Sequence, residues 1–309
     1  MQLLPSTYPI LCAAMNKVSD ANLASAVWKA GAMPSLSAFN FITDNGFDFE
    51  AMTAEVNLFK SMSPDGEFVY SVNSSTFMSD EFYSWVTQNK IQYIEIILDL
   101  AKIDDSNALG KYTQQHISLI DIFAKKYKTL GVKLICKTLR KFTILEIEKK
   151  FSNLFDAYIL KGPDGAGSII DNSSSTLLED QRDILDHYPD CLLITSGGIS
   201  TRDDIKLFLD NGAIGVCIGT LFALTEESKI SRETKLFMLG KDIQKFNDTH
   251  QNAIVFSHDV NEFDNNKTHG LTLGIQSTST GHVFAGKALT NVTKIKTVAE
   301  LIKELTYDI

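Results

Sequence analysis

The sequence predicts a single (β/α)8 barrel, the α/β architecture called the TIM barrel, with a small irregular C-terminal insertion or lid. Three observations predict it. Eight short apolar runs recur along the 309 residues, helical periodicity fills the segments between them, and glycine-rich turns follow the last two runs. An open, doubly wound sheet shares the alternation of strands and helices, so it stays as the competing architecture.

The eight apolar runs are continuous rather than alternating, which is typical of parallel strands buried on both faces. Helical segments follow, and Asp20 can cap the first of them while Gly212 can end the one after the seventh run. The predicted strands are 10–13, 33–36, 68–72, 93–97, 132–136, 157–160, 192–195 and 215–218, and clear helical stretches are 21–30, 117–130, 201–211 and 298–305.

The alternation of apolar runs and helical segments stops between about residues 241 and 281, a stretch rich in Asn, Asp, His, Thr and Ser. Two apolar runs, 253–256 and 271–275, flank a polar stretch there, which is the pattern of a hairpin or lid. We therefore expect residues 1–230 and 282–309 to form the barrel and residues 241–281 to form a lid or hairpin insertion.

Composition restricts the class of partner and the compartment. The net charge of −9 disfavours nucleic acid and anionic membranes as main partners. The four cysteines form no CxxC pair, and no apolar run is long enough to span a bilayer, so we expect no metal site and a reduced, cytoplasmic location. The basic run over residues 125–141 is expected to form a solvated helix face.

The strongest local signal is a pair of glycine turns at the ends of the seventh and eighth predicted strands. Ser196-Gly197-Gly198 follows one strand, and Gly219-Thr220 follows the next. Glycine lets the backbone approach an anion closely and point its N–H groups at it. Barrels often bind phosphate at these two loops together with a helix N-terminus, so the turns predict a phosphate site.

A series of further segments occurs in a fixed order around these turns. They include Pro9-Ile10 with Ala13-Ala14-Met15, then Val72-Asn73, and Ala285-Gly286-Lys287 near the end; the others are 24–31, 156–162, 196–199, 219–222 and 225–228. This ordered set resembles the nitronate monooxygenase family, formerly called 2-nitropropane dioxygenases. The family also includes flavin-dependent enoyl-acyl-carrier-protein reductases.

The resemblance implies FMN bound across the carboxyl ends of the strands, with NADH or NADPH as the electron donor. Ala14 and Met15 would lie beside the isoalloxazine ring, and Asn73 and Lys137 would donate hydrogen bonds to it. The full set of expected cofactor-binding residues is Ala13, Ala14, Met15, Asn73, Lys137, Asp164, Gly167, Ser196, Gly197, Gly198, Gly219 and Thr220.

One segment departs from the family pattern. After the sixth strand the family usually has Glu-Ala-Gly-Gly-His, whereas this chain has Asp164 in place of the Glu and Ser168 in place of the catalytic His. These two residues are the candidate catalytic groups. A Ser hydroxyl cannot abstract a carbon-bound proton near neutral pH without a base beside it. One of the histidines 250, 258, 269 and 282 could instead be carried over the flavin by a lid.

Several functions fit this pattern. The leading hypothesis is NAD(P)H-driven reduction of an activated electrophile: an enoyl thioester, which an acyl carrier protein could present, a quinone or a nitro compound. The alternatives are nitronate oxidation with O2, a non-redox isomerase or synthase that binds phosphate, and a flavin-binding protein without turnover. A homodimer is also left open.

Overall fold

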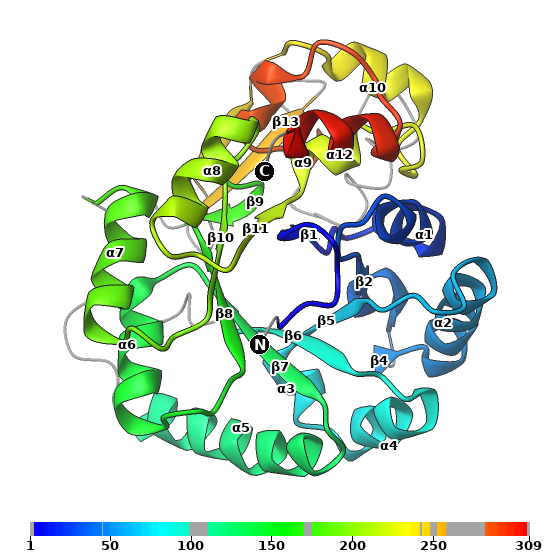
Figure 1. The fold of residues 1–309 in the computed structure, drawn as a ribbon. Coiled ribbons are helices and arrows are strands. Elements are labelled where there is room, and N and C mark those ends of the chain that lie inside the picture. Colours follow the sequence, from blue (N-terminus) through cyan, green and yellow to red (C-terminus); the bar gives the residue numbers. More distant parts are fainter. Residues whose placement is uncertain are drawn as a thin grey trace.

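The computed structural model describes residues 3–44, 46–98, 111–169, 175–241, 243–247, 252–257 and 282–307. Eight parallel strands surround a common axis with helices outside them (Figure 1), which confirms the predicted (β/α)8 barrel. In chain order the barrel strands are β1 (Ile10–Cys12), β2 (Ser35–Ser37), β5 (Val69–Asn73), β6 (Tyr93–Ile97), β7 (Lys133–Thr138), β8 (Ala157–Lys161), β10 (Leu193–Ser196) and β11 (Gly215–Ile218).

Hydrogen bonds at the first strand close the sheet on itself. β1 pairs with β11 on one side, with Leu11 opposite Cys217. On the other side Met33, just before β2, donates to the Ile10 carbonyl at 2.8 Å and accepts from the Cys12 N–H at 2.8 Å. A doubly wound sheet would leave β1 or β2 as an open edge. The competing architecture is therefore excluded, and each of the eight predicted runs contributes a barrel strand.

The helices begin and end where the local sequence signals place them. The Asp20 carboxylate accepts from the Leu23 N–H at 2.9 Å and caps α1. Gly212 follows α8 with a φ of +94°, a conformation that glycine adopts without strain. The helices are α1 (Ala21–Lys29), α2 (Phe49–Met62), α3 (Ser74–Phe77), α4 (Asp80–Asn89), α5 (Lys111–Thr129), α6 (Lys141–Lys150), α7 (Leu177–His187), α8 (Arg202–Asp210), α9 (Thr220–Ala223), α10 (Arg232–Met238) and α12 (Val298–Thr306).

A second, antiparallel sheet extends from the loop after β8. β13 (Asn252–Ser257) pairs with β12 (Gln244–Asn247), with β14 (His282–Val283) and with β9 (Gly167–Ile169). The apolar run 253–256 is thus a strand, and its hairpin partner is the polar segment 244–247. The other expected run, 271–275, lies outside the described residues, so the extent of the predicted insertion stays a prediction. Two short strands, β3 (Ile42–Thr43) and β4 (Gly46–Phe47), form a hairpin that belongs to neither of the larger sheets.

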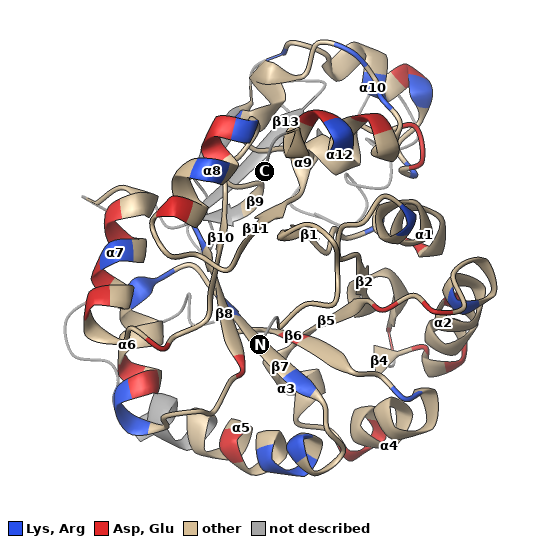
Figure 2. Cartoon of the chain, viewed as in Figure 1, with Lys and Arg blue, Asp and Glu red and all other residues tan. Residues whose placement is uncertain are grey.

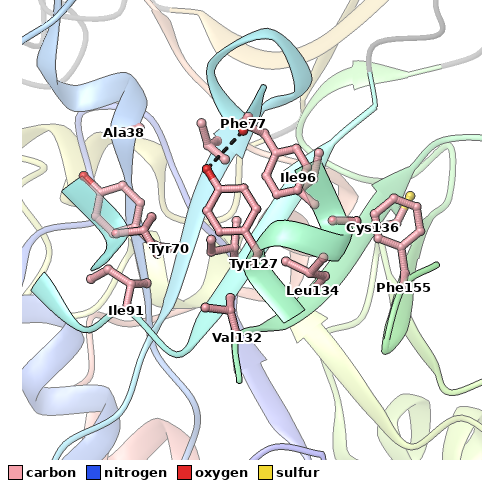
Figure 3. Close-up of a cluster of buried hydrophobic side chains, with 14 of the residues drawn as sticks. Ala38, Tyr70, Phe77, Ile91, Ile96, Tyr127, Val132, Leu134, Cys136 and Phe155 are labelled. Atoms are coloured by element: carbon pink, nitrogen blue, oxygen red, sulfur yellow. Dashed lines mark hydrogen bonds between the residues drawn. The ribbon is translucent and has the colours of Figure 1, made fainter. Parts of the chain in front are cut away.

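The core has one layer inside the barrel and further layers between the strands and the helices. Figure 3 shows part of an outer layer, where the Tyr127 hydroxyl from α5 donates to the Phe77 carbonyl at 3.0 Å. Inside the barrel the strands contribute a tightly buried apolar plug, whose residues include Leu11, Met33, Val69, Ile135, Ile159, Ile194 and Cys217. Among the described residues this plug fills the amino-terminal half of the barrel and leaves its carboxyl end for a ligand.

The basic run 125–141 divides between the surface and the barrel interior. On α5, Lys125 pairs with Asp121 at 2.6 Å and Lys126 with Asp80 at 3.0 Å. In Figure 2, positions of positively and negatively charged residues lie close together along the ribbons of α5, α7 and α8. Lys137 instead points into the barrel, where its side chain is only 13% exposed. None of the helices in the described part of the chain is long and apolar enough to cross a membrane.

Candidate active site

A cavity of about 420 Å³ opens at the carboxyl ends of the barrel strands. This volume lies within the roughly 300–1,000 Å³ typical of small-molecule and cofactor sites. Every barrel strand, or the loop that follows it, contributes to its wall. The lining residues include Ala13, Met15, Asn16, Ser37, Ser71, Asn73, Ile97, Lys137, Arg140, Lys161, Asp164, Gly167, Ser196, Gly197, Gly198, Gly219, Thr220 and Phe284.

The floor of the cavity follows from strand periodicity. Side chains two residues apart on a strand point to the same face. Two residues beyond the apolar plug, the interior positions therefore become polar: Ser71 follows Val69, Lys137 follows Ile135, Lys161 follows Ile159 and Ser196 follows Ile194. The sequence thus changes from apolar to polar at one level of the barrel, and that level is the floor of the site.

Lys137, one of the floor residues, forms an ion pair with Glu95, which lies behind the cavity lining. Glu95, which is fully buried, accepts from the Ser71 hydroxyl at 2.7 Å and from Lys137 Nζ at 3.2 Å through its Oε1 atom. Burial disfavours the charged form of Lys137, but the Glu95 carboxylate outweighs it, so the pKa of Lys137 is raised. Glu95 Oε2 is buried and has no hydrogen-bond partner among the described residues. Lys137 is therefore a fixed positive charge at the cavity wall.

Lys161 is a cavity residue that the sequence motifs did not single out. It is the last residue of β8, it lines the cavity, and its Nζ atom donates to the Ala166 carbonyl. Burial and the nearby Lys137 charge lower its pKa to about 7. The spacing of two from the apolar Ile159 was the available signal, since it predicts an inward-pointing lysine at a strand's carboxyl end.

The two glycine turns present unused backbone donors. Gly197 and Gly198 have φ angles of +109° and +74°, which an L-residue rarely adopts. In the part of the chain that the structure describes, no protein acceptor binds the N–H groups of Gly197, Gly198 or Gly219. The N-terminus of α8 is satisfied separately, because Asp204 accepts from the Ser200 and Thr201 N–H groups. The donor set therefore fits an anion such as a phosphate.

The N–H groups of Gly197, Gly198 and Gly219 are called the anion cradle below. Segments distant in the chain border it. A Cβ atom placed on Gly219 would meet Ala13 Cβ at 3.5 Å and Met15 Sδ at 3.7 Å, so the first-strand loop lies directly beside the second turn. On the other side, the Gly286 N–H donates to the Thr220 hydroxyl at 2.9 Å. The predicted phosphate turns and the predicted ring-binding segment thus share one cavity.

Asp164 closes the rim of the cavity. A Cβ atom on Gly198 would approach Asp164 Cβ to 2.9 Å, so only glycine fits that turn without a shift. Lys287 pairs with the Asp164 carboxylate at 3.4 Å, and its N–H donates to the Asp164 carbonyl at 3.1 Å. Asp164 therefore links the first glycine turn to the C-terminal segment.

The structure places all twelve expected cofactor-binding residues along this one cavity. Asn73 Oδ1 accepts from the Thr76 N–H at 2.8 Å and caps α3, and its Nδ2 group has no acceptor among the described residues. Of the two candidate catalytic residues, Asp164 lines the cavity. Ser168 lies in β9 opposite Ala253, and its side chain is outside the described part of the chain.

The histidine alternatives divide between described and undescribed parts of the chain. His282 lies in β14 with its backbone paired to Ser257. The others, His250, His258 and His269, lie outside the described residues. No described histidine side chain reaches the cavity.

Comparison with known proteins supports the resemblance. A family model described as nitronate monooxygenase matches residues 121–251. FabK from Thermotoga maritima has the same fold, with a TM-score of 0.77 at 17% identity over 99% of this chain and 93% of that one. A mutant form of that FabK gives 0.75 at 16% identity with the same coverage. Nitroalkane oxidase from Streptomyces ansochromogenes gives 0.69 at 14% identity over 98% of this chain and 96% of that one. No curated protein sequence matches at a significant level.

These findings agree with the expectations from the sequence. The solved structures show the same barrel over nearly the whole chain, and the family model that matches part of it is that of an oxidoreductase. The matched segment begins within α5 and includes both glycine turns and β12. The resemblance of this chain to the nitronate monooxygenase family, predicted from its sequence motifs, is therefore confirmed.

Proposed function

We propose that this protein is an FMN-dependent oxidoreductase that takes electrons from NADH or NADPH and reduces an activated electrophile. The acceptor would be an enoyl thioester, which an acyl carrier protein could present, a quinone or a nitro compound. One observation carries the proposal: unused N–H groups of Gly197, Gly198 and Gly219 form an anion cradle in the same cavity as Lys137 and the first-strand loop. The family match supports the same conclusion.

The chain's own groups fit the parts of FMN. The glycine turns suit its phosphate, and Thr220 adds a hydroxyl beside them. Lys137, held positive by Glu95, suits a ring edge where negative charge collects on reduction. Asn16 Oδ1 is a buried cavity acceptor with no partner among the described residues, and it suits a ligand N–H. Bound FMN would supply hydride transfer.

The site favours reduction over nitronate oxidation. Oxidation of a nitroalkane begins when a base removes a carbon-bound proton. The usual His is replaced by Ser168, and no described His side chain lines the cavity. Reduction requires no removal of a carbon-bound proton, so it fits a cavity in which that His is replaced.

Ligand binding tests the cofactor assignment. Purified protein is titrated with FMN, riboflavin and ribose 5-phosphate, and binding is followed by flavin fluorescence and calorimetry. FMN should bind at least ~100-fold tighter than riboflavin, because hydrogen bonds to a charged phosphate contribute about 1.5–3 kcal/mol each. Binding of ribose 5-phosphate without FMN binding would overturn the proposal in favour of a non-redox barrel.

Anaerobic reduction tests the chemistry. NADH or NADPH should bleach the bound flavin, and an enoyl thioester, a quinone or a nitro compound should restore its colour. Flavin that binds but is bleached by neither nucleotide would indicate a flavin-binding protein without turnover. Consumption of nitroalkane and O2 at a comparable rate would instead support nitronate oxidation.

A further inference from the structure

Lys161 occupies a closely fitted position in the cavity. The loop after β8 folds over its side chain, and a Cβ atom on Gly165 would lie 2.7 Å from Lys161 Cε. The Nζ atom donates to the Ala166 carbonyl, and Gly167 borders it on the same loop. Its amine is therefore held at the cavity wall and does not extend into bulk solvent.

The two lysines of the site have opposite electrostatic environments. Lys137 on β7 has the Glu95 carboxylate at 3.2 Å, whereas Lys161 on the adjacent strand β8 is buried beside the Lys137 charge. The pKa of Lys137 is raised and that of Lys161 is lowered to about 7. Neighbouring titratable groups whose pKa values are shifted in opposite directions are typical of acid–base pairs in active sites. The charged and titratable groups around Lys161 are Lys137 (β7), Glu95 (β6), Cys217 (β11), and Asp164 and Arg140 on the cavity wall.

We propose that Lys161 is the catalytic acid–base group of this site and donates the proton that completes reduction of the substrate. This inference rests on the proposed function. With an enoyl thioester, bound FMN would supply the hydride that originates from NAD(P)H, and this hydride would bond to the β-carbon as the double bond opens. The Lys161 N–H bond breaks, its proton bonds to the α-carbon, and the neutral amine takes a proton from solvent. The substrate gains two electrons and NAD(P)H loses two.

The other polar groups at the cavity are less suited to this role. Lys137 stays protonated because it is paired with buried Glu95. Asp164 is 46% exposed and pairs with Lys287, so its carboxylate accepts hydrogen bonds at the rim. A group that changes protonation near neutral pH combines a populated acid form with an effective proton transfer. Among the described cavity residues, Lys161 meets that condition.

Chemical labelling tests the acid–base property without any activity measurement. The protein without added flavin is treated with a trace of acetic anhydride between pH 6 and pH 11, and acetylation is measured by peptide mass spectrometry. Lys161 should reach half of its maximal reactivity near pH 7, with Lys137 in the same cavity as the control. At pH 8 the acetylation rates of the two lysines should differ at least ~100-fold, because each unit of difference in pKa changes the fraction of free amine about tenfold. Equal titration of both above pH 10 would overturn the proposal.

Turnover tests the role itself, with crotonyl-CoA as the enoyl thioester. Lys161→Met and Lys161→Arg should keep FMN binding within about threefold and lose ~10²–10⁴-fold in kcat. The wild type should lose activity as pH rises above the pKa of Lys161, and both variants should lack this alkaline limb. Methylamine should partly restore Lys161→Ala, which a merely structural role would not allow.

The outcomes separate the two proposals. If wild type and variants bind FMN and share one rate and one pH profile, the role of Lys161 is wrong and the proposed function stands. If wild type does not bind FMN, the proposed function is wrong, and the acid–base role in this reduction is wrong with it, whatever the labelling shows.

Discussion

Replacing Lys161 by Met should make the folded protein more stable at neutral pH. The amine has a pKa near 10.5 when exposed and about 7 in the folded chain, so folding at pH 7 releases about half a proton and this shift costs about 4 kcal/mol. The side chain keeps partial exposure to the cavity, which reduces this cost. Met has a similar volume and no charge. We therefore expect Lys161→Met to raise the free energy of unfolding by about 2–3 kcal/mol.

The sign of the pH dependence is fixed by linkage. Between pH 7 and pH 10.5 the unfolded chain binds more protons at this position than the folded chain, so stability rises with pH. The gain of Lys161→Met should be largest at or below pH 7 and should vanish above pH 10.5. Urea unfolding at pH 6, 7, 8 and 9 measures it.

The matched control is Lys137→Met on the adjacent strand. It leaves the buried Glu95 carboxylate without its cation and should cost about 3–5 kcal/mol. The two substitutions are chemically identical, so opposite changes in the free energy of unfolding would depend only on the environment of each lysine. Equal destabilisation by both would refute the electrostatic assignment of the site.

Two further predictions concern the cradle and the ion pair. Gly198→Ala should weaken FMN binding at least ~10-fold, because its Cβ would meet Asp164 at 2.9 Å, whereas Gly131→Ala has a similar φ of +78° and no neighbour within 4 Å. Both should lose about 1–2 kcal/mol of stability from the left-handed backbone, and equal flavin affinity in the two variants would contradict the cradle. Ser71→Ala removes a 2.7 Å hydrogen bond to Glu95 and should cost about 1.5–3 kcal/mol in urea unfolding; no loss would show that the bond is energetically neutral.

The fold was predictable because its signals are local. Continuous apolar runs, the Asp20 cap and the glycine after α8 depend on a few neighbouring residues, and the chain repeats the same unit eight times. Barrel closure needed the structure, since the contacts of Met33 with Ile10 and Cys12 join strands that periodicity alone cannot bring together. The pairing of 253–256 with the polar segment 244–247 was also beyond the sequence, because register depends on the partner strand.

Part of the candidate site could also be predicted from local sequence signals. The glycine turns and Lys137 were visible in the sequence, because a residue directly after a strand of a parallel barrel must lie at the carboxyl end, where ligands bind. The order of the strands thus determined where the cavity lies, and the glycine turns supply backbone N–H donors that suit an anion.

Only the tertiary structure decided how the two lysines differ. Lys137 and Lys161 both lie at the carboxyl ends of apolar strands, and nothing local distinguishes their amines. Folding brings Glu95 to one of them and leaves the other beside a positive charge in a buried wall. Charge interactions and desolvation depend on distance and burial rather than on sequence spacing, so the protonation chemistry of this site is set by the folded barrel.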